Sequence, residues 1–260
     1  MDLGLKCRRA IVCASSRGLG RACAMSLAMN GVAVTLNGRD EAKLEQTAAD
    51  IRKQAGGVEV KAVLADVSTR EGQQKLLAAC PDPDILVNNN GGPPFTDFRK
   101  LDRDAMLNGV VMNMVTPIEL IQAVIDKMVA RKFGRIVNIT SLSVKMPVPG
   151  IDLSSGARAG LTAFLAGVSR TVAQHNVTIN CLLPGFFDTD RMRGGFDATA
   201  KMQGRSVNEI ADERANEVPA RRFGEPAEFG EACAFLCSAQ AGYITGQNVL
   251  ADGGSYPGTF

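Results

Sequence analysis

A glycine-containing turn near the N-terminus is the first part of the chain whose residue types could do chemistry. It follows the apolar run 10–13 and precedes an amphipathic stretch, so a strand, a tight turn and a helix are expected in that order. At such a turn, backbone N–H groups and the positive end of a helix dipole face an anion, and glycine allows close approach. The pattern predicts a site for the pyrophosphate of a dinucleotide, with a simple structural turn as the alternative. The predicted binding residues are Ser15, Ser16, Arg17, Gly18, Leu19 and Gly20.

Cysteine and histidine, two further types with reactive side chains, are placed unfavourably for metal or hydrolytic chemistry. Seven cysteines are scattered without a C-x-x-C pair, and His175 is the only histidine. Scattered, odd-numbered cysteines favour reduced, buried thiols over a disulfide framework or a zinc site. A single histidine argues against a Ser-His-Asp hydrolase. We therefore expect no metal site, and we expect His175 to lie in a surface turn.

Short β-branched runs alternate with longer helical stretches, and these elements must position the turn. In the stretch 41–53, for example, Leu44, Ala48 and Ile51 recur at helical spacing. This alternation predicts one α/β domain over residues 1–260, a Rossmann-type doubly wound parallel sheet with helices on both faces. The strand candidates are 10–13, 32–36, 60–64, 85–87, 136–139, 177–180 and 248–250.

The segment 188–222 departs from this rhythm. It is polar and irregular, contains Gly194, Gly195 and Gly204, and lies between the last two strand candidates. Long excursions from a compact domain are usually functional, so we expect a substrate lid. The alternative is a surface insertion with one or two helices.

Composition and charge limit the possible partners. Hydrophobic residues make up 45% of the 260 residues and charged residues 22%, which excludes a disordered scaffold. The net charge of +2 is too balanced for nucleic-acid binding. No uninterrupted apolar run approaches about 18 residues, and the N-terminus lacks the apolar stretch of a signal peptide. A cytoplasmic protein without a membrane span is expected.

Several further motifs follow the glycine turn in order. They are Asp66-Val67, Val87-Asn88-Asn89-Asn90-Gly91, Asn138-Ile139-Thr140-Ser141, Pro184-Gly185 with Thr189, Tyr243-Ile244-Thr245-Gly246-Gln247, and Asp252-Gly253-Gly254. With them, the chain resembles the classical short-chain dehydrogenases/reductases over essentially its whole length, most closely the branch of the 3-oxoacyl carrier-protein reductases. The resemblance implies an active-site serine at Ser141 and an active-site asparagine at Asn113. It implies coenzyme contacts from Asp66, Val67, Asn89, Asn90, Gly91, Thr140, Pro184, Gly185, Phe187 and Thr189.

Two positions depart from the family pattern. The family carries a Tyr 13 residues after the active-site serine and a Lys four residues later, where this chain has Ser154 and Arg158. Hydride transfer to a carbonyl builds negative charge on oxygen, which a positioned acid normally neutralises. Serine is a much weaker acid than tyrosine, and arginine stays charged. We therefore expect Ser141, Asn113, Ser154 and Arg158 to form a hydrogen-bonding pocket for an oxyanion, with Arg158 also reaching the coenzyme ribose.

Two other residues are candidates for the missing acid. Lys145 lies four residues after Ser141, on a loop expected to border the cleft, although a solvated lysine is the alternative. Tyr256 lies in the C-terminal tail, which in tetrameric relatives can pack at subunit interfaces near a neighbouring site. Interface packing alone is the alternative for Tyr256.

The end of the second strand candidate indicates which coenzyme is bound. NAD-binding strands usually end in an acidic residue that binds the ribose hydroxyls. Here Gly38 occupies that position, Arg39 follows it, and Arg17 lies in the phosphate turn. Two arginines near the ribose favour a 2′-phosphate, so the predicted coenzyme is NADP(H). The alternative is that Arg39 pairs with Asp40 or Glu41 at the surface.

Three functions remain open. The first is NADP(H)-dependent reduction of a carbonyl or an activated double bond in a small-molecule or carrier-linked substrate. Four cations of the expected lid, Arg191, Arg193, Lys201 and Arg205, hint at an anionic or carrier-linked substrate. The second is an NADP(H)-binding sensor or assembly module with little turnover, and the third is a lyase or isomerase on the same scaffold.

Self-association is also expected from the resemblance. Family members pair through two long helices, which here correspond to 102–131 and 153–174. The prediction is a homo-oligomer, either a dimer or a tetramer.

Overall fold

Seven short strands form one sheet, and each coincides with an apolar run of the sequence. The computed structural model describes residues 2–93 and 95–259, so Met1, Pro94 and Phe260 lie outside the described residues. The strands pair in parallel in the order β3-β2-β1-β4-β5-β6-β7. The predicted Rossmann-type sheet and all seven strand candidates are therefore confirmed, with small shifts at the ends. The strands are β1 (Arg9–Val12), β2 (Ala33–Gly38), β3 (Val60–Leu64), β4 (Ile85–Asn88), β5 (Gly134–Ile139), β6 (Val177–Pro184) and β7 (Asn248–Ala251).

Helices connect the strands, and many begin at a residue whose side chain accepts a hydrogen bond from the first turn. Asp40, Thr69 and Asp102 cap three of them in this way. The α-helices are α1 (Gly18–Met29), α2 (Glu41–Ala55), α3 (Arg70–Ala79), α4 (Arg103–Val110), α5 (Thr116–Ala130), α6 (Asp152–Val172), α7 (Asp190–Gln203), α8 (Val207–Glu217) and α9 (Pro226–Leu236). Shorter elements are the 3₁₀ turns η1 (Phe98–Lys100), η3 (Leu142–Val144), η4 (Ala173–His175) and η5 (Gln240–Tyr243), and the π-helix η2 (Val111–Val115).

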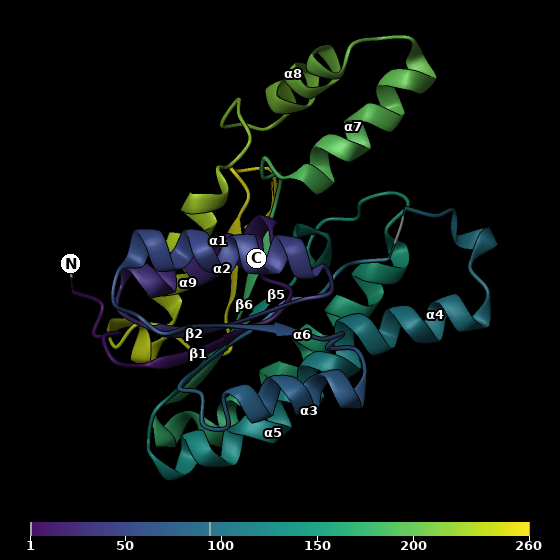
Figure 1. Ribbon diagram of the computed structural model, residues 1–260. Coiled ribbons are helices and arrows are strands. Elements are labelled where there is room, and N and C mark those ends of the chain that lie inside the picture. The colour runs from purple at the N-terminus through teal and green to yellow at the C-terminus, as the bar shows by residue number, and fades with distance from the viewer. Residues whose placement is uncertain (1, 94, 260) are drawn as a thin grey trace.

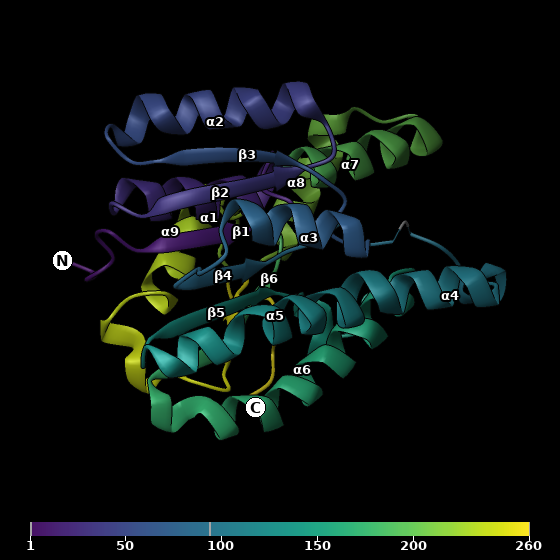
Figure 2. The ribbon, with the colours of Figure 1, turned by 60° about the horizontal axis from the view of Figure 1, so that its bottom comes forward.

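Both faces of the sheet are covered by helices (Figures 1 and 2). Ala10 and Val12 of β1 contribute to a core cluster shared with α1, α2 and α9. Ile11 and the adjacent Cys13 contribute to a second cluster shared with α3, α5 and α6. This alternation follows from the two-residue period of a strand buried on both sides.

Most of the cysteines are buried, and the histidine lies in a turn. All seven cysteines are free, and six of them are buried. No group of three or more His, Cys, Asp or Glu side chains among residues 2–93 and 95–259 could hold a metal ion. His175 ends the turn η4 and is half-buried.

The strand order reverses between β1 and β4, and this reversal places the crevice. The chain moves outward from β1 to β3, returns to β4 beside β1, and then moves outward again to β7. In open parallel sheets, ligands bind at the carboxyl ends of the strands at such a switch point. The glycine turn after β1 and the asparagines after β4 both lie there.

The expected lid is more regular than predicted. Figure 1 shows α7 and α8 (green) standing together at one end of the molecule, away from the main sheet. They share a small cluster of their own, formed by Phe196, Ala200 and Ile210. The segment therefore contains two capped helices, as the alternative of a surface insertion with one or two helices allowed, and its role as a lid stays a prediction.

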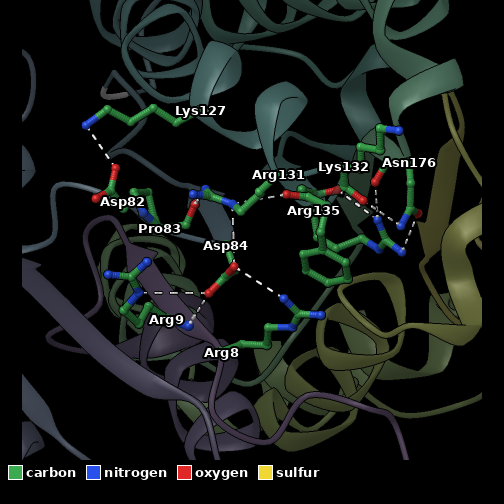
Figure 3. Close-up of polar contacts among 12 residues, drawn as sticks. Arg8, Arg9, Asp82, Pro83, Asp84, Lys127, Arg131, Lys132, Arg135 and Asn176 are labelled. Atoms are coloured by element: carbon green, nitrogen blue, oxygen red, sulfur yellow. Dashed lines mark hydrogen bonds and ion pairs between the residues drawn. The ribbon is translucent and has the colours of Figure 1, made fainter.

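A network of charged residues joins the amino ends of the strands (Figure 3). The buried carboxylate of Asp84 pairs with Arg8 at 3.4 Å and with Arg131 at 3.6 Å, and it accepts the Arg9 backbone N–H at 2.9 Å. Arg135, only 1% exposed, donates to the carbonyls of Ser238, Gly134 and Asn176 and to the Asn176 side chain. These contacts hold the end of the sheet opposite the crevice.

One helical run, Arg103–Ala130, is long and apolar enough by length and composition to cross a membrane. Its mean hydropathy reaches 1.3 although polar residues such as Asn113 interrupt it, so counting uninterrupted apolar runs did not detect it. Its α5 part packs into the core through Leu120, Ile121 and Val124. A core helix passes the same test, and α5 packs in this way, although only 39% of the tested window is buried.

Candidate active site

The glycine turn has a backbone that only small residues permit. Gly18 has a φ of +58°, in the left-handed region. A Cβ on Gly20 would lie 2.4 Å from the carbonyl oxygen of Ala14, so the first turn of α1 can approach β1 only with glycine at this position. The Asn89 side chain donates to the same oxygen at 3.2 Å. The end of β4 therefore holds the turn in place.

Some side chains of the predicted turn residues support the fold, and others are exposed. Ser15 is fully buried, donates to the Val12 carbonyl at 2.7 Å and accepts from the Asn37 N–H at 3.0 Å, so it ties the turn to β2. Leu19 packs against the core. Arg17, in contrast, is exposed.

The end of β2 is crowded where an NAD-binding protein places its carboxylate. A Cβ on Gly38 would lie 3.0 Å from the side chain of Ser16. An acidic side chain at position 38 would therefore force Ser16 to move. This crowding agrees with a site that does not bind ribose hydroxyls through an acid.

Arg39 lies over the same end of the sheet but not with the partners considered from sequence. It pairs with Asp66 at 3.3 Å rather than with Asp40 or Glu41, and its side chain remains 70% exposed. Although burial raises the pKa of Asp66, hydrogen bonds from Ser68 and the charge of Arg39 lower it overall. The side chain of Val67, the next residue, is buried in the core, which leaves its backbone for ligand contact.

A groove of about 370 Å³ runs beside the glycine turn. Arg17, Gly18 and Thr189 line it, together with Asp188 and Asp190. Thr189 caps α7 by accepting from the Met192 N–H at 3.4 Å. The turn after β1 and the start of the lid are thus the two sides of one groove.

The residues after β6 are held by backbone packing. A Cβ on Gly185, which follows Pro184, would lie 2.7 Å from the Cα of Asp252, so glycine is required for this approach. The side chain of Phe187 points into the core, where its ring lies 5.2 Å from that of Phe229, edge to face. The ring of Phe187 is therefore turned away from the crevice, which sequence position alone did not reveal.

Asn113 lies in the π-helix η2 between α4 and α5. Its Nδ2 donates to the Gly109 carbonyl at 3.3 Å, whereas its buried Oδ1 has no protein partner among the described residues. π-helical turns often occur at functional sites because they redirect a side chain. Here the irregularity turns a polar side chain toward the interior.

A cavity of about 20 Å³ lies beside Asn113, and its lining mixes amide and apolar side chains. Asn88 Nδ2 donates to Asn138 Oδ1 at 2.9 Å, which joins the ends of β4 and β5, and Asn90 Nδ2 donates to the Met112 carbonyl at 3.1 Å. The volume and the polar groups suit one buried water. The lining residues are Asn88, Asn89, Asn90, Met112, Asn113, Thr116, Pro117, Leu120, Asn138, Ile139, Arg158 and Leu161. Sequence reasoning gave Asn88 and Asn138 no role of their own, although amides at the ends of apolar strands are a usable signal.

Ser154 and Arg158 contact each other on α6. Arg158 Nε donates to Ser154 Oγ at 3.1 Å, and Arg158 Nη1 donates to the Ile139 carbonyl at the end of β5 at 2.8 Å. Both side chains are buried. Burial, and secondly the charge of Arg191, lower the pKa of Arg158 to about 10, which leaves the guanidinium charged at neutral pH.

Ser141 and Thr140 follow β5 at the same end of the sheet. Ser141 Oγ accepts from the backbone N–H of Ser143 at 3.1 Å and lies 2.9 Å from the Ser143 hydroxyl. Among the described residues, Ser141 makes no hydrogen bond to Ser154, Arg158 or Asn113. Thr140 is buried, and its Oγ1 has no protein partner in the described part of the chain.

The two other acid candidates lie against each other. Lys145 Nζ is 5.4 Å from the centre of the Tyr256 ring, within the range of a cation–π contact. The Asp252 carboxylate accepts the Tyr256 backbone N–H at 2.8 Å, which fixes the start of the C-terminal tail. The structure therefore brings the Tyr256 phenol of the C-terminal tail against the ammonium group of Lys145, four residues after Ser141.

The carboxyl end of the sheet thus combines a dinucleotide crevice with a hydroxyl, an amide and a guanidinium group, the layout of a nicotinamide-dependent oxidoreductase. The family profile described as enoyl-(acyl carrier protein) reductase matches residues 13–256. The chain belongs to the classical short-chain dehydrogenase/reductase family, in the branch of the 3-oxoacyl carrier-protein reductases.

Individual relatives span nearly the whole chain. The "NADPH-dependent reductase BacG" of Bacillus subtilis (strain 168) is 33% identical over 95% of this chain and 97% of its own length. A "3-oxoacyl-[acyl-carrier-protein] reductase FabG" from Chlamydia muridarum (strain MoPn / Nigg) is 32% identical over 95% of this chain and 96% of its own length. Among solved structures, L-sorbose reductase from Gluconobacter frateurii, complexed with NADPH and L-sorbose, has a TM-score of 0.94 at 26% identity, covering 99% of this chain and all of that one.

Proposed function

We propose that the protein is an NADP(H)-dependent reductase of a carbonyl or an activated double bond, with Ser154 and Arg158 in place of the family's Tyr and Lys. The hydrogen bond from Arg158 Nε to Ser154 Oγ is the observation that carries this proposal. It places a cation and a hydroxyl at the two substituted positions, both side chains are buried, and Arg158 also lines the small cavity beside Asn113. The reacting end is therefore remodelled rather than lost.

The coenzyme assignment is supported by the glycine turn and by the arginines near it. A Cβ on Gly91 would meet no atom within 4 Å, so a ligand can approach the backbone after β4. Arg17 and Arg39 can bind a 2′-phosphate, because a guanidinium fork matches phosphate oxygens. When bound, NADPH supplies the hydride that the substrate carbon accepts. The NADPH named for the relatives agrees with this choice.

Although serine is a weaker acid than tyrosine, we propose Ser154 as the proton donor to the substrate, because the charge of the adjacent Arg158 guanidinium favours its ionised form. Because Ser154 Oγ accepts a hydrogen bond from Arg158, its own proton is free to be donated to the substrate oxygen. The guanidinium charge stabilises the negative charge that forms on the substrate oxygen and on Ser154. Ser141 has its proton available for the same oxygen. Asn113 lines the cavity with an unpaired Oδ1, a suitable acceptor for a water that restores the proton.

Substitution at the two positions tests the proposal. NADPH affinity is measured by titration, and turnover by the loss of nicotinamide absorbance with a panel of carbonyl and enone substrates. Ser154→Ala is expected to lower kcat with an unchanged NADPH Kd, and Arg158→Met is expected to lower kcat and to weaken NADPH binding without abolishing it. Ser155→Ala is the matched control, because the neighbouring Ser155 hydroxyl donates to the Ile151 carbonyl within α6 and should leave turnover unchanged.

Other outcomes identify the alternatives. Tight NADPH binding without turnover on any substrate would favour the sensor or assembly module over the reductase. If Ser154→Ala keeps full activity while Tyr256→Phe and Lys145→Met lose it, the cation–π pair is the acid instead. A Ser154→Tyr/Arg158→Lys double variant should gain generic carbonyl reduction if the pocket otherwise has the family's geometry.

We also propose that the chain forms a homo-oligomer through α4, α5 and α6. Figure 2 shows these helices running together on one side of the sheet. Large apolar side chains are exposed on them, at Met106 (44%), Leu107 (52%) and Phe164 (45%). Burying such a patch against a second copy is favourable. Sedimentation analysis should find a dimer or tetramer that Leu107→Glu with Phe164→Glu dissociates, and a monomeric wild type would contradict this.

We also propose a cytoplasmic location, on the evidence of the cysteines and of helix α5. The free thiols suit a reducing compartment, and α5 packs into the protein core rather than into lipid. Cell fractionation should recover the protein in the soluble fraction, and retention in salt-washed membranes would contradict the proposal.

A further inference from the structure

The four cations of the lid region differ in whether a carboxylate neutralises them. Arg193 forms a two-pronged pair with Asp188, at 2.6 Å and 2.5 Å. Arg205 pairs with Glu213 at 2.7 Å. Arg191 forms no ion pair with any carboxylate among residues 2–93 and 95–259. Lys201 likewise forms no ion pair in the described part of the chain, so Arg191 and Lys201 are the two cations of this region without a carboxylate partner.

Arg191 reaches from the lid to the opposite side of the crevice. It lies in the first turn of α7, and its Nη2 is 3.4 Å from the Gly92 carbonyl and 3.3 Å from the Pro93 carbonyl. A Cβ on Gly92 would lie 2.9 Å from Nη2, so glycine leaves the room that the guanidinium occupies. Arg191 thus joins the segment after β6 to the segment after β4. These two segments border the place where the strand order predicts a ligand.

The hydrogen bonds of Arg191 hold its guanidinium in position but use only a few of its N–H donors. Both hydrogen bonds are long and come from one nitrogen, and the acceptors are neutral carbonyls. A guanidinium has five N–H donors, so most of its fork remains available. Arg191 is also near enough to Arg158 for its charge to act on that buried group. Two cations at one end of the crevice create a positive potential without an ion-paired carboxylate to cancel it.

From this geometry we infer that Arg191 binds a carboxylate of the substrate, so that the natural substrate is an oxo acid or an unsaturated acid. The inference rests on the proposed reductase function and names its substrate class. A planar carboxylate matches the guanidinium fork in two parallel hydrogen bonds. It would lie at the crevice mouth while the reacting group lies deeper, beside Ser154 and Arg158. A free acid fits this arrangement better than a carrier-linked thioester, which has no carboxylate in that place.

Matched pairs of probes test this directly. The acids are 4-oxopentanoate and 4-oxocyclohexanecarboxylate, and each is compared with its methyl ester, which keeps the carbonyl and removes the charge. The wild type should show a higher kcat/KM for the acids. Arg191→Met should lower kcat/KM for the acids by roughly 10- to 100-fold, the range for a charge-assisted hydrogen bond, and leave the esters nearly unchanged. Arg191→Lys should recover part of the loss, and the ion-paired Arg193→Met is the control that should behave as wild type.

Binding measurements separate this inference from the proposed function. Calorimetry of each acid with the NADP⁺-bound protein should give a Kd that Arg191→Met weakens, whether or not any probe is reduced. Arg191-dependent binding without turnover would contradict the reductase function and leave the carboxylate site standing.

Equal kcat/KM for acids and esters, or an unchanged preference in Arg191→Met, would overturn the inference. A weakened NADPH Kd in Arg191→Met with unchanged acid preference would also overturn it, since Arg191 would then bind the coenzyme phosphates. A preference for a phosphate-bearing ketone over both acids would overturn the choice of carboxylate.

Discussion

Two buried arginines contact opposite ends of the same strand and differ in how fully their donors are used. Arg135, at the start of β5, donates to four acceptors and lies 4.4 Å from the centre of the Phe133 ring. Arg158 donates to the carbonyl at the end of β5 and to Ser154, and its Nη2 makes no hydrogen bond to the described residues. Desolvating a guanidinium is costly, so unused donors in a buried one suggest a role in ligand contact.

The other charged residues at the two ends of the sheet also differ. At the amino end, the single carboxylate of Asp84 is shared by Arg8, Arg9 and Arg131 (Figure 3). At the carboxyl end, neither Arg158 nor Arg191 pairs with a carboxylate in the described part of the chain. At one end of the sheet the arginines share a carboxylate, and at the other these two arginines have none.

Removing Arg158 should have the largest effect, and it should be on catalysis. Arg158→Met is expected to lower kcat by roughly 10²- to 10³-fold, as for loss of an oxyanion-stabilising group. Thermal unfolding should change little, because only two hydrogen bonds are lost. Steady-state kinetics and a melting curve on the same preparation measure both, and a variant that melts early with unchanged kcat would contradict the comparison.

Removing Arg135 should instead lower stability and leave catalysis unchanged. Arg135→Met leaves buried carbonyls without donors, so the free energy of unfolding should fall by about 3 kcal/mol. Urea denaturation measures this loss. The kcat per folded molecule should stay at the wild-type value, and a selective loss of kcat would show that the two ends of β5 are not separate in function.

Asp84→Asn should have a smaller effect on stability. The substitution keeps the size of the side chain but removes the charge that three arginines share, and we expect a loss of about 2 kcal/mol. Because the carboxylate is buried, the difference from wild type should persist at high salt, as urea denaturation in both conditions can check. A difference that vanishes in salt would mean that the network is effectively exposed.

Arg193→Met should have the smallest effect. The side chain is 56% exposed, and exposed ion pairs contribute little. We expect Tm and kcat/KM to match the wild type within error. A clear loss of activity would show that the Asp188 pair positions the lid, and the contrast with Arg191 would then weaken.

The sheet could be predicted because its signal is local. Each strand is a short apolar run, and runs such as 177–180 and 248–250 identify strands even where the ends are longer in the structure. The one or two helices considered for 188–222 could not be bounded from the sequence, because the fully buried apolar cluster there is only Phe196, Ala200 and Ile210. Their capping residues, Thr189 and Ser206, are the signal that sequence reasoning left unused.

The site was less predictable, because side-chain direction depends on tertiary contacts. The contact between Ser154 and Arg158 follows from their spacing of four on one helix. Nothing local indicates that Phe187 turns into the core, or that Arg191 reaches Gly92, 99 residues away. Such contacts depend on how the loops after β4 and β6 meet.

The π-helix has a consequence for how the chain tolerates insertion and deletion. A π-turn is equivalent to one extra residue within an α-helix, and each residue turns an α-helix by about 100°. Deleting one residue from 111–115 would rewind η2 as ordinary helix and rotate α4 about its axis relative to α5. Asn113 would swing away from the cavity, and Met106 and Leu107 would face a different direction. The one extra residue thus determines both the inward direction of the Asn113 amide and the direction in which the exposed apolar side chains of α4 face.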